Sequence, residues 1–175
     1  MVTLFATMLS FANEASFFTI KNDAKRTALT LNNVKEGNLL SIKDYNGVIL
    51  YKELIQKSGV YTKGFDLTSL PDGSYNFEFD KDLEIKTIPF SVTSGIVLFN
   101  KEEEKSIFKP FVRVEGDLVY VSRLTLNGEP LTIDIFFTDS SYSELMYSEK
   151  IKDVKTIERI YKLTGLHKGS YKMVL

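Results

Sequence analysis

The stretch DLTSLPDGSYNFEF, at residues 66–79, returns near the end of the chain as KLTGLHKGSYKMVL, at residues 162–175. The two stretches align without a gap at an offset of 96. With the preceding residue included, six of fifteen positions are identical: Leu67/Leu163, Thr68/Thr164, Leu70/Leu166, Gly73/Gly169, Ser74/Ser170 and Tyr75/Tyr171. The same offset aligns Tyr51 with Tyr147, Glu53 with Glu149 and Ile55 with Ile151. A repeat at a fixed offset indicates one structural unit used twice, each copy spanning roughly 75–80 residues.

The side-chain pattern inside the repeat has a period of two. In the first copy Tyr75, Phe77 and Phe79 alternate with polar residues, and in the second Tyr171 and Met173 do so. Alternation of this kind is typical of a strand with one face in a core and the other in water. The glycine just before each strand is expected to supply a positive φ in a tight turn.

The spacing of three between Ile151, Val154, Ile157 and Ile160 resembles a helix, but the repeat predicts strands there. The first-copy counterpart of this segment is VYTKGFDL, at residues 60–67, which contains Gly64 and alternates apolar with polar residues. Because no segment of ten or more residues has a convincing period of 3.6, helices are not expected.

Turn residues separate further short strands. Residues 39–54 form a predicted hairpin around Asn46-Gly47, and residues 117–126 and 131–137 flank a predicted turn at 127–130. Within 83–92 the alternation slips by one residue, which predicts a β-bulge, and Pro89 predicts an edge strand. We therefore expect an all-β fold of two tandem immunoglobulin-like or fibronectin-III-like β-sandwich domains, at 13–94 and 107–175, with a linker at 95–106.

The second copy ends at Leu175, where the first copy continues into the strand at 83–92. An unpaired strand edge is a liability in any sheet. Two interpretations follow: either the chain is truncated, or a partner adds a strand at the edge of domain 2.

The N-terminal residues form a candidate leader. Val2 to Ala12 is an apolar stretch of 11 residues, too short to cross a bilayer, and Ser10-Phe11-Ala12 suits a cleavage site before Asn13. The basic residues expected at the start of a leader are missing, so residues 1–12 are either a signal peptide incomplete at its N-terminus or a first strand. We favour the signal peptide, and with it export to the periplasm, the outer-membrane surface or the extracellular space.

Composition excludes several classes of protein. The chain contains 22 Lys and Arg against 23 Asp and Glu, which lacks the basic footprint of a nucleic-acid-binding protein. No segment predicts a transmembrane span. There are no cysteines, so thiol catalysis, thiolate zinc sites and disulfides are absent and stability must come from core burial. The charged run at 101–105 is expected to be a solvated loop.

The residues offer little for catalysis. His167 is the only histidine, and it replaces Pro71 of the first copy in a predicted turn. Glu53, Glu149 and Asp44 lie on or beside predicted hairpins, and nothing in the sequence brings two of them into a cleft. Three aromatic residues, Phe108, Phe111 and Phe136, are candidates for a stacking surface, although we expect them to lie in the core. We therefore predict no enzyme, no catalytic or metal-ligating residue and no cofactor.

Three stretches of the sequence resemble a known protein family. The stretches IKDYNGVILYKEL, FDLTSLPDGSYNFEF and IKTIPFSV resemble the immunoglobulin-like C-terminal sorting domains of proteins exported by the Bacteroidetes type IX secretion system. The matching positions are Asp44, Gly47, Tyr51, Leu67, Leu70, Gly73 and Tyr75. The resemblance covers about 55 residues of the first domain and, more weakly, 146–175. It implies an exported protein from that kind of bacterium.

Three functions follow as hypotheses. The first is an exported, non-enzymatic envelope protein that is structural or binds another envelope protein. The second is a sorting or carrier domain for type IX secretion, which predicts that residues 107–175 export a fused reporter. The third is a small-ligand or glycan-binding protein, which predicts an interdomain cleft with convergent polar groups.

Overall fold

The computed structural model describes residues 17–23, 26–139, 142–162 and 169–175. These residues form antiparallel strands, and the helical segments among them are two short 3₁₀ turns, η1 (Leu67–Ser69) and η2 (Lys101–Glu103). The prediction of an all-β sandwich fold is confirmed. The expected leader at 1–12 and the turn that holds His167 lie outside the described residues.

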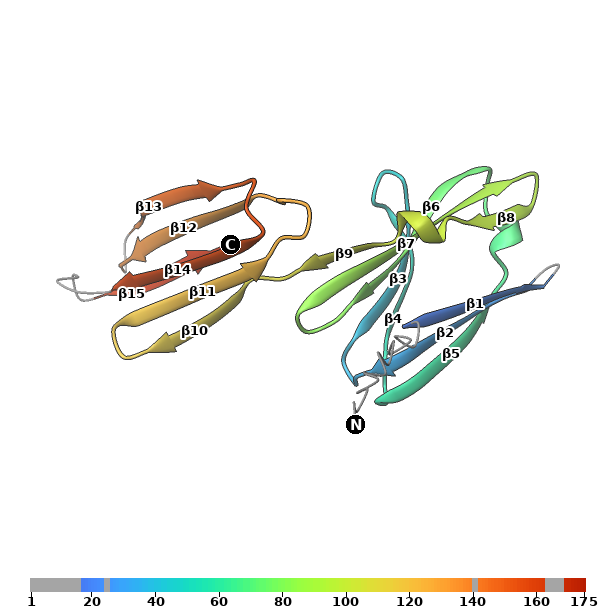
Figure 1. Ribbon diagram of the computed structural model, residues 1–175, viewed down its shortest axis with the longest axis horizontal. Helices are drawn as coiled ribbons and strands as arrows, with labels where there is room; N and C mark the ends of the chain where they lie inside the picture. Colours follow the sequence, from blue (N-terminus) through green and yellow to red (C-terminus); the bar gives the residue numbers. More distant parts are fainter. Residues whose placement is uncertain (1–16, 24–25, 140–141, 163–168) are drawn as a thin grey trace, which may run out of the picture.

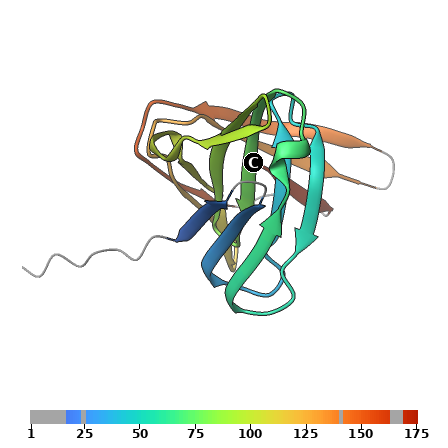
Figure 2. The same cartoon turned by 90° about the vertical axis from the view of Figure 1, so that its right-hand side faces the viewer.

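The N-terminal half of the chain contains two sheets. Strands β1, β2 and β5 form one sheet in the order β1-β2-β5, and the other has the order β4-β3-β6-β7-β8, with β9 also paired to β7. The strands are β1 (Phe18–Asp23), β2 (Arg26–Val34), β3 (Leu39–Asp44), β4 (Ile49–Leu54), β5 (Gly59–Phe65), β6 (Gly73–Asp80), β7 (Glu84–Thr93), β8 (Ile96–Phe99) and β9 (Lys105–Phe108). Figure 2 views this half from its end and shows β1, β2 and β5 side by side.

The C-terminal half contains two three-stranded sheets, with the orders β10-β11-β14 and β13-β12-β15. Its strands are β10 (Phe111–Glu115), β11 (Leu118–Leu124), β12 (Leu131–Thr138), β13 (Ser143–Ile151), β14 (Thr156–Lys162) and β15 (Ser170–Val174). The two halves lie at opposite ends of the long axis and are joined through β9 (Figure 1).

The sequence repeat has a counterpart in strand order and in register. The order β1-β2-β5 with β4-β3-β6 recurs as β10-β11-β14 with β13-β12-β15. Ile42 of β3 pairs with Phe77 of β6, and Ile135 of β12 pairs with Met173 of β15, 96 residues after Phe77. The same correspondence in the other sheet relates Leu29↔Lys63 to Val121↔Arg159. Equal registers place equivalent side chains at equivalent points of both halves, because one residue of slip would reverse every face.

Each half has its own buried cluster between its two sheets. In the N-terminal half Leu29 of β2 and Phe77 of β6, from opposite sheets, are at most 1% exposed. In the C-terminal half Val121 of β11 and Ile133 of β12 meet in the same way, with Ile157 of β14 fully buried beside them. Alternating inward side chains from two sheets are what a β-sandwich core requires.

Residues 156–162 form a strand, as the repeat predicts, while Leu163 lies outside the described residues. β13 ends at Ile151 and β14 runs from Thr156 to Lys162, so Ile157 and Tyr161 lie on a strand. The hairpin at 39–54 is also confirmed: β3 and β4 pair across a turn in which Gly47 has φ of 82°. Asp44 Oδ1 stabilises this turn by accepting hydrogen bonds from the backbone N–H groups of Asn46 at 2.9 Å and Val48 at 2.8 Å.

The expected positive φ is wrong for Gly73, which is not among the described residues with positive φ. Gly73 is instead the first residue of β6. At Gly169 a Cβ atom would lie 2.3 Å from Cε2 of Phe137, so glycine is needed there for the close approach of a buried ring.

Three expectations about residues 83–106 need correction. β7 pairs with β6 from Gly73↔Val92 to Asp80↔Ile85 without a register shift, so the predicted bulge is absent from this pairing. Pro89 does not mark a sheet edge, because β9 pairs with β7 before it and β8 pairs with β7 after it. The expected linker at 95–106 therefore contributes β8 and part of β9 to the first sandwich.

Candidate functional site

Glu53 is the centre of a polar cluster between β4 and β5. Its carboxylate forms an ion pair with Lys63 at 2.5 Å and accepts hydrogen bonds from the hydroxyls of Tyr51 and, at 2.9 Å, Tyr61. The hydrogen bonds from Lys63 and Tyr51 hold the pKa of Glu53 below its usual value. Burial, together with the bond to Glu53, raises the pKa of Tyr61, so that hydroxyl stays protonated.

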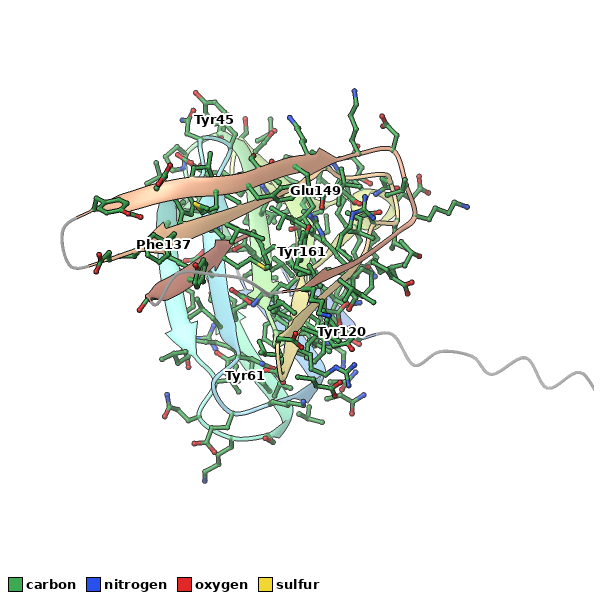
Figure 3. The ribbon with its side chains drawn as sticks, turned by 90° about the vertical axis from the view of Figure 1, so that its left-hand side faces the viewer. Tyr45, Tyr61, Tyr120, Phe137, Glu149 and Tyr161 are labelled. Carbon is green, nitrogen blue, oxygen red and sulfur yellow. The ribbon has the colours of Figure 1, made fainter. Side chains whose placement is uncertain are left out.

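Glu149 of β13 repeats this arrangement in the other half. Arg159 of β14 lies 3.1 Å from its carboxylate, and the hydroxyl of Tyr161 donates a hydrogen bond to it (Figure 3). Burial alone would raise the pKa of Glu149, but the bonds from Tyr161 and Arg159 outweigh burial and lower the pKa. Glu149 follows Glu53 by 96 residues, and Arg159 follows Lys63 by the same offset.

These carboxylates do not form a catalytic pair. They belong to different halves, each has its own cation, and each lowered pKa opposes action as a general acid near neutral pH. Asp44, the third candidate, is bound to backbone N–H groups of its turn. Within the described ranges no three Asp, Glu or His side chains gather as metal ligands would.

The seam between the two halves holds a small cavity of about 210 Å³. Half of its eight lining residues are apolar, among them Leu83 and Leu124, and the other half are polar or charged. The guanidinium of Arg123, also at this cavity, is bound to the backbone, with Nε 2.9 Å from the carbonyl oxygen of Phe108 and a terminal nitrogen 3.0 Å from that of Pro130. The volume is below the usual range of roughly 300–1,000 Å³ for ligand pockets. Its two charged side chains are already engaged, because Lys109 is paired with Asp80 and Arg123 is bound to the backbone.

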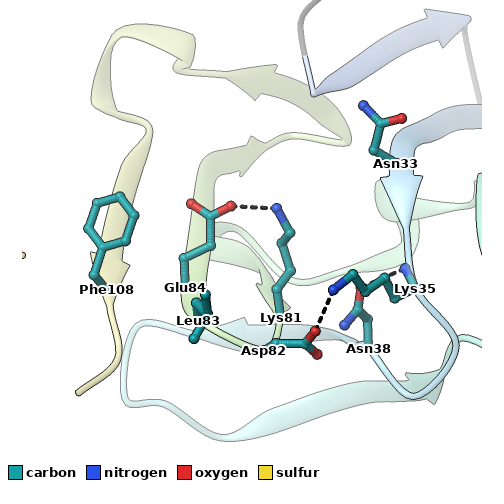
Figure 4. A pocket seen from close by; sticks show the side chains of 8 residues that line it. All are labelled: Asn33, Lys35, Asn38, Lys81, Asp82, Leu83, Glu84 and Phe108. Carbon is teal, nitrogen blue, oxygen red and sulfur yellow. Dashed lines mark hydrogen bonds and ion pairs between the residues drawn. The ribbon is translucent and has the colours of Figure 1, made fainter. Parts of the chain in front are cut away.

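A larger pocket, of about 370 Å³, lies beside the turn between β6 and β7 (Figure 4). Its charged side chains are paired with one another. Lys35 lies 2.8 Å from Asp82, and Lys81 is bound to Glu84. Lys81 also lies over the ring of Phe17, with its nitrogen 4.6 Å from the ring centroid. Because the charges cancel inside the pocket, it offers no net charge to select an ionic ligand.

The three aromatic candidates for a stacking surface differ in their exposure to solvent. Phe108 and Phe136 are half-buried and Phe111 is 53% exposed, and none of the three belongs to the two buried clusters, so the expectation that they lie in the core is wrong. The reason is local. Phe111 begins β10, which lies at the edge of a three-stranded sheet, and all five residues of β10 are exposed. A single exposed ring does not form a stacking platform for sugars or bases.

The most distinctive surface is the outer edge of β15. Its equivalent in the N-terminal half, β6, lies between β3 and β7, whereas β15 pairs with β12 alone among the described strands. The side chains differ accordingly. Phe77 and Phe79 of β6 are each 1% exposed, while their equivalents are half-buried at Met173 and 41% exposed at Leu175. The described residues therefore leave the position of β7 empty in the C-terminal half.

Sequence reasoning identified this edge but missed the two carboxylate clusters and the Arg123 contacts. The offset of 96 that aligns Glu53 with Glu149 also aligns Lys63 with Arg159, and this repeated pairing of charges was the signal for the clusters. Arg123 has no counterpart signal, because its partners are backbone carbonyl groups.

Comparison of the chain with models of known protein families and with curated protein sequences gave no match. In the part of the chain that the structure describes, no helix has the length and apolar character to span a membrane.

Proposed function

We propose that this protein is a non-enzymatic interaction module of the bacterial envelope, built from two tandem immunoglobulin-like sandwich domains, which binds a partner protein at the outer edge of β15. One observation carries the proposal: β15 lacks, among the described strands, the neighbour that β6 has in β7. The outer edge of β15 is equivalent to the edge of β6 that pairs with β7 in the N-terminal half.

A strand edge with no neighbour among the described strands supports strand addition for two physical reasons. The backbone N–H and C=O groups on the outer side of a strand form hydrogen bonds with an added strand, which supply affinity without sequence readout. The inward side chains of β15 supply apolar surface as well. Covering a large apolar side chain completely contributes about 1.5–3 kcal/mol, and Met173 of β15, like Leu175 directly after the strand, is incompletely covered.

The export part of the proposal is supported by the sequence. The apolar stretch at 2–12 and its small residues fit the leader of an exported chain. Mass spectrometry of the protein recovered from the envelope of the native bacterium tests this directly. We expect an N-terminus at Asn13, whereas an intact Met1 on the recovered protein contradicts a leader at 1–12.

Peptide selection tests the interaction itself. A library of displayed random decapeptides is selected for binding to the full chain. The selected peptides are then tested on a closed variant, in which residues 80–94 are appended after Leu175 so that the chain supplies its own copy of β7. We expect the selected peptides to bind the full chain and to show no binding to the closed variant.

A matched control keeps the appended length while removing its ability to pair. In this control the appended copy carries Ile88→Asp and Phe90→Asp, which prevents burial of its inward face. Peptide binding should persist with this control. Selected peptides that bind both variants equally bind elsewhere, and would rule out the edge of β15 as the binding site.

A further inference from the structure

The pairing of β7 with β6 describes what the edge of β15 would accept. This inference rests on the proposed function, since it concerns the same edge. In the N-terminal half Phe90 pairs with Tyr75, and Ile88 pairs with Phe77. Tyr171 and Met173 are the equivalents of Tyr75 and Phe77 at the offset of 96, and Met173 pairs with Ile135 as Phe77 does with Ile42.

The inward face at this position requires large apolar side chains. Ile88 and Phe90 of β7 are 2% and 3% exposed. The ring of Phe90 stacks on Tyr75, with centroids 5.4 Å apart, and lies 5.3 Å from the ring of Phe77. A strand placed likewise against β15 would set its corresponding residue over Tyr171 and the next inward residue beside Met173. Aromatic pairs at such distances stabilise beyond the area they bury.

The outward face adds a charge preference. Lys172 of β15 is exposed and pairs across the sheet with Phe136 of β12, which carries no charge. In the N-terminal half the residue that faces this position from β7 is Pro89, opposite Asn76. An acidic residue opposite Lys172 would form a favourable cross-strand pair.

The same lysine disfavours a second copy of this chain as the occupant. Antiparallel pairing of β15 with itself, centred on Lys172, keeps the inward faces aligned but sets Lys172 against Lys172 of the other copy. Like charges directly opposite one another destabilise a sheet. A pairing centred on Met173 instead sets Lys172 opposite Val174 and leaves Ser170 of β15 unpaired, so it covers less of the strand than a partner segment in the register of β7 would.

We infer that the occupant is an extended segment of a partner protein that runs antiparallel to β15 in the register of β7. It carries an aromatic residue opposite Tyr171, a branched aliphatic residue opposite Met173 and an acidic residue between them, opposite Lys172. This chemistry describes a short amphipathic strand, not a helix or a folded surface.

A synthetic peptide tests the inference. Its sequence is that of residues 84–93 with Pro89→Glu, and binding to the full chain is measured by fluorescence anisotropy. A second peptide additionally carries Phe90→Ser, and a third exchanges residues 89 and 90 so that the aromatic faces outward. Removing or reversing the aromatic anchor should weaken binding by about tenfold or more. A tenfold change in Kd corresponds to a smaller free energy than the burial of one large apolar side chain contributes.

Variants of the protein locate the contact. Met173→Lys should weaken peptide binding by at least about tenfold, because it places a charge beneath the incoming strand. Met146→Lys is the matched control: Met146 is 50% exposed on β13, at the other edge of the same sheet, and this change should leave binding unaltered. Lys172→Glu should weaken the glutamate peptide and strengthen its Pro89→Lys counterpart.

The outcomes separate this inference from the proposed function. If peptides selected from the random library bind the edge of β15 but lack the alternating aromatic and acidic pattern, this inference fails and the proposed function stands. If no peptide distinguishes the full chain from the closed variant, both fail. A concentration-dependent dimer in sedimentation that Met173→Lys abolishes would overturn the choice of a partner protein over a second copy.

Discussion

Replacing Gly169 by alanine should destabilise the C-terminal half, and the same change at Gly73 should not. The two glycines occupy the same place in the repeat. A Cβ at Gly169 would lie 2.3 Å from Cε2 and 2.7 Å from Cζ of Phe137, and 3.3 Å from the carbonyl oxygen of Thr138. A Cβ at Gly73 would meet only the ring of Tyr75, at 3.5 Å and beyond, an ordinary contact.

The magnitude follows from what must move. Carbon atoms pack at about 3.5–4.0 Å, so the ring of Phe137 must shift by more than about 1 Å. Phe137 is 5% exposed, and its ring centroid lies 5.2 Å from that of Tyr171 and 6.0 Å from that of Tyr142, so its displacement disturbs a packed group. Overpacking of a buried site costs about 1–3 kcal/mol, and we expect about 2 kcal/mol at Gly169.

The opposite sign is expected at Gly73. Its φ is not positive, so alanine fits the native backbone there and removes freedom mainly from the unfolded chain. Such changes stabilise a protein by about 0.4–1 kcal/mol. Equilibrium urea unfolding gives both values, and hydrogen exchange assigns each change to its half. Equal effects of the two substitutions, or a neutral Gly169→Ala, would refute the reasoning that a ring occupies the site of the second Cβ.

Three further predictions follow. Phe77→Ala should lower the free energy of unfolding by about 3–5 kcal/mol in urea titrations, because this ring is 1% exposed and loses three aromatic neighbours; a loss below about 1 kcal/mol would contradict its place in the core. Because the pKa of Glu149 is lowered on folding, its contribution to stability is present above its unfolded pKa and disappears as the pH falls through its folded pKa. Glu149→Gln should therefore flatten the loss of stability below about pH 4.5 in acid titrations, and parallel wild-type and variant curves would disprove this. Arg123→Ala removes two bonds to backbone carbonyl groups at the seam and should speed hydrogen exchange at neighbouring amides without unfolding either core; unchanged exchange would show that these bonds do not restrain the seam.

The repeated stretch predicted the fold well because burial and strand alternation act locally. In the repeat, Tyr161 aligns with Phe65, which directly follows Gly64. This alignment predicted a strand where the spacing of isoleucines suggested a helix, and β14 lies there. Register followed from the same cause. Once Phe77 and Met173 must both face a core, their partner strands can align in only one phase.

What the sequence did not predict depends on partners from distant parts of the chain. Alternation within 83–92 reports which face of β7 is buried, but not which strands occupy its second edge, so the change from β9 to β8 near Pro89 was interpreted as a bulge and a sheet edge. Gly169 was interpreted as a turn residue because glycine serves both turns and close contacts. Only the position of the Phe137 ring distinguishes the two.

The candidate site was partly predicted, because aligning the two copies places β15 at the position of β6, which has β7 as its second neighbour. The chemistry of the edge required the structure, because Met173 and Leu175 look like core residues in the sequence and only their exposure shows incomplete cover. The carboxylates required it too: Glu53 and Glu149 are plausible acids in the sequence, and the cations Lys63 and Arg159 that neutralise them come from other strands.

Binding at β15 and stability of the C-terminal half are thermodynamically coupled in the proposed arrangement. A strand that binds only the folded sheet stabilises it by about 2.7 kcal/mol when its free concentration is one hundred times its Kd. The smaller half should therefore gain stability from a bound peptide while the N-terminal half, whose equivalent position β7 already fills, gains none. Hydrogen exchange at the amides of β12 and β6 reads the two halves separately. Protection that rises equally in both would mean that the peptide does not act through the edge of β15.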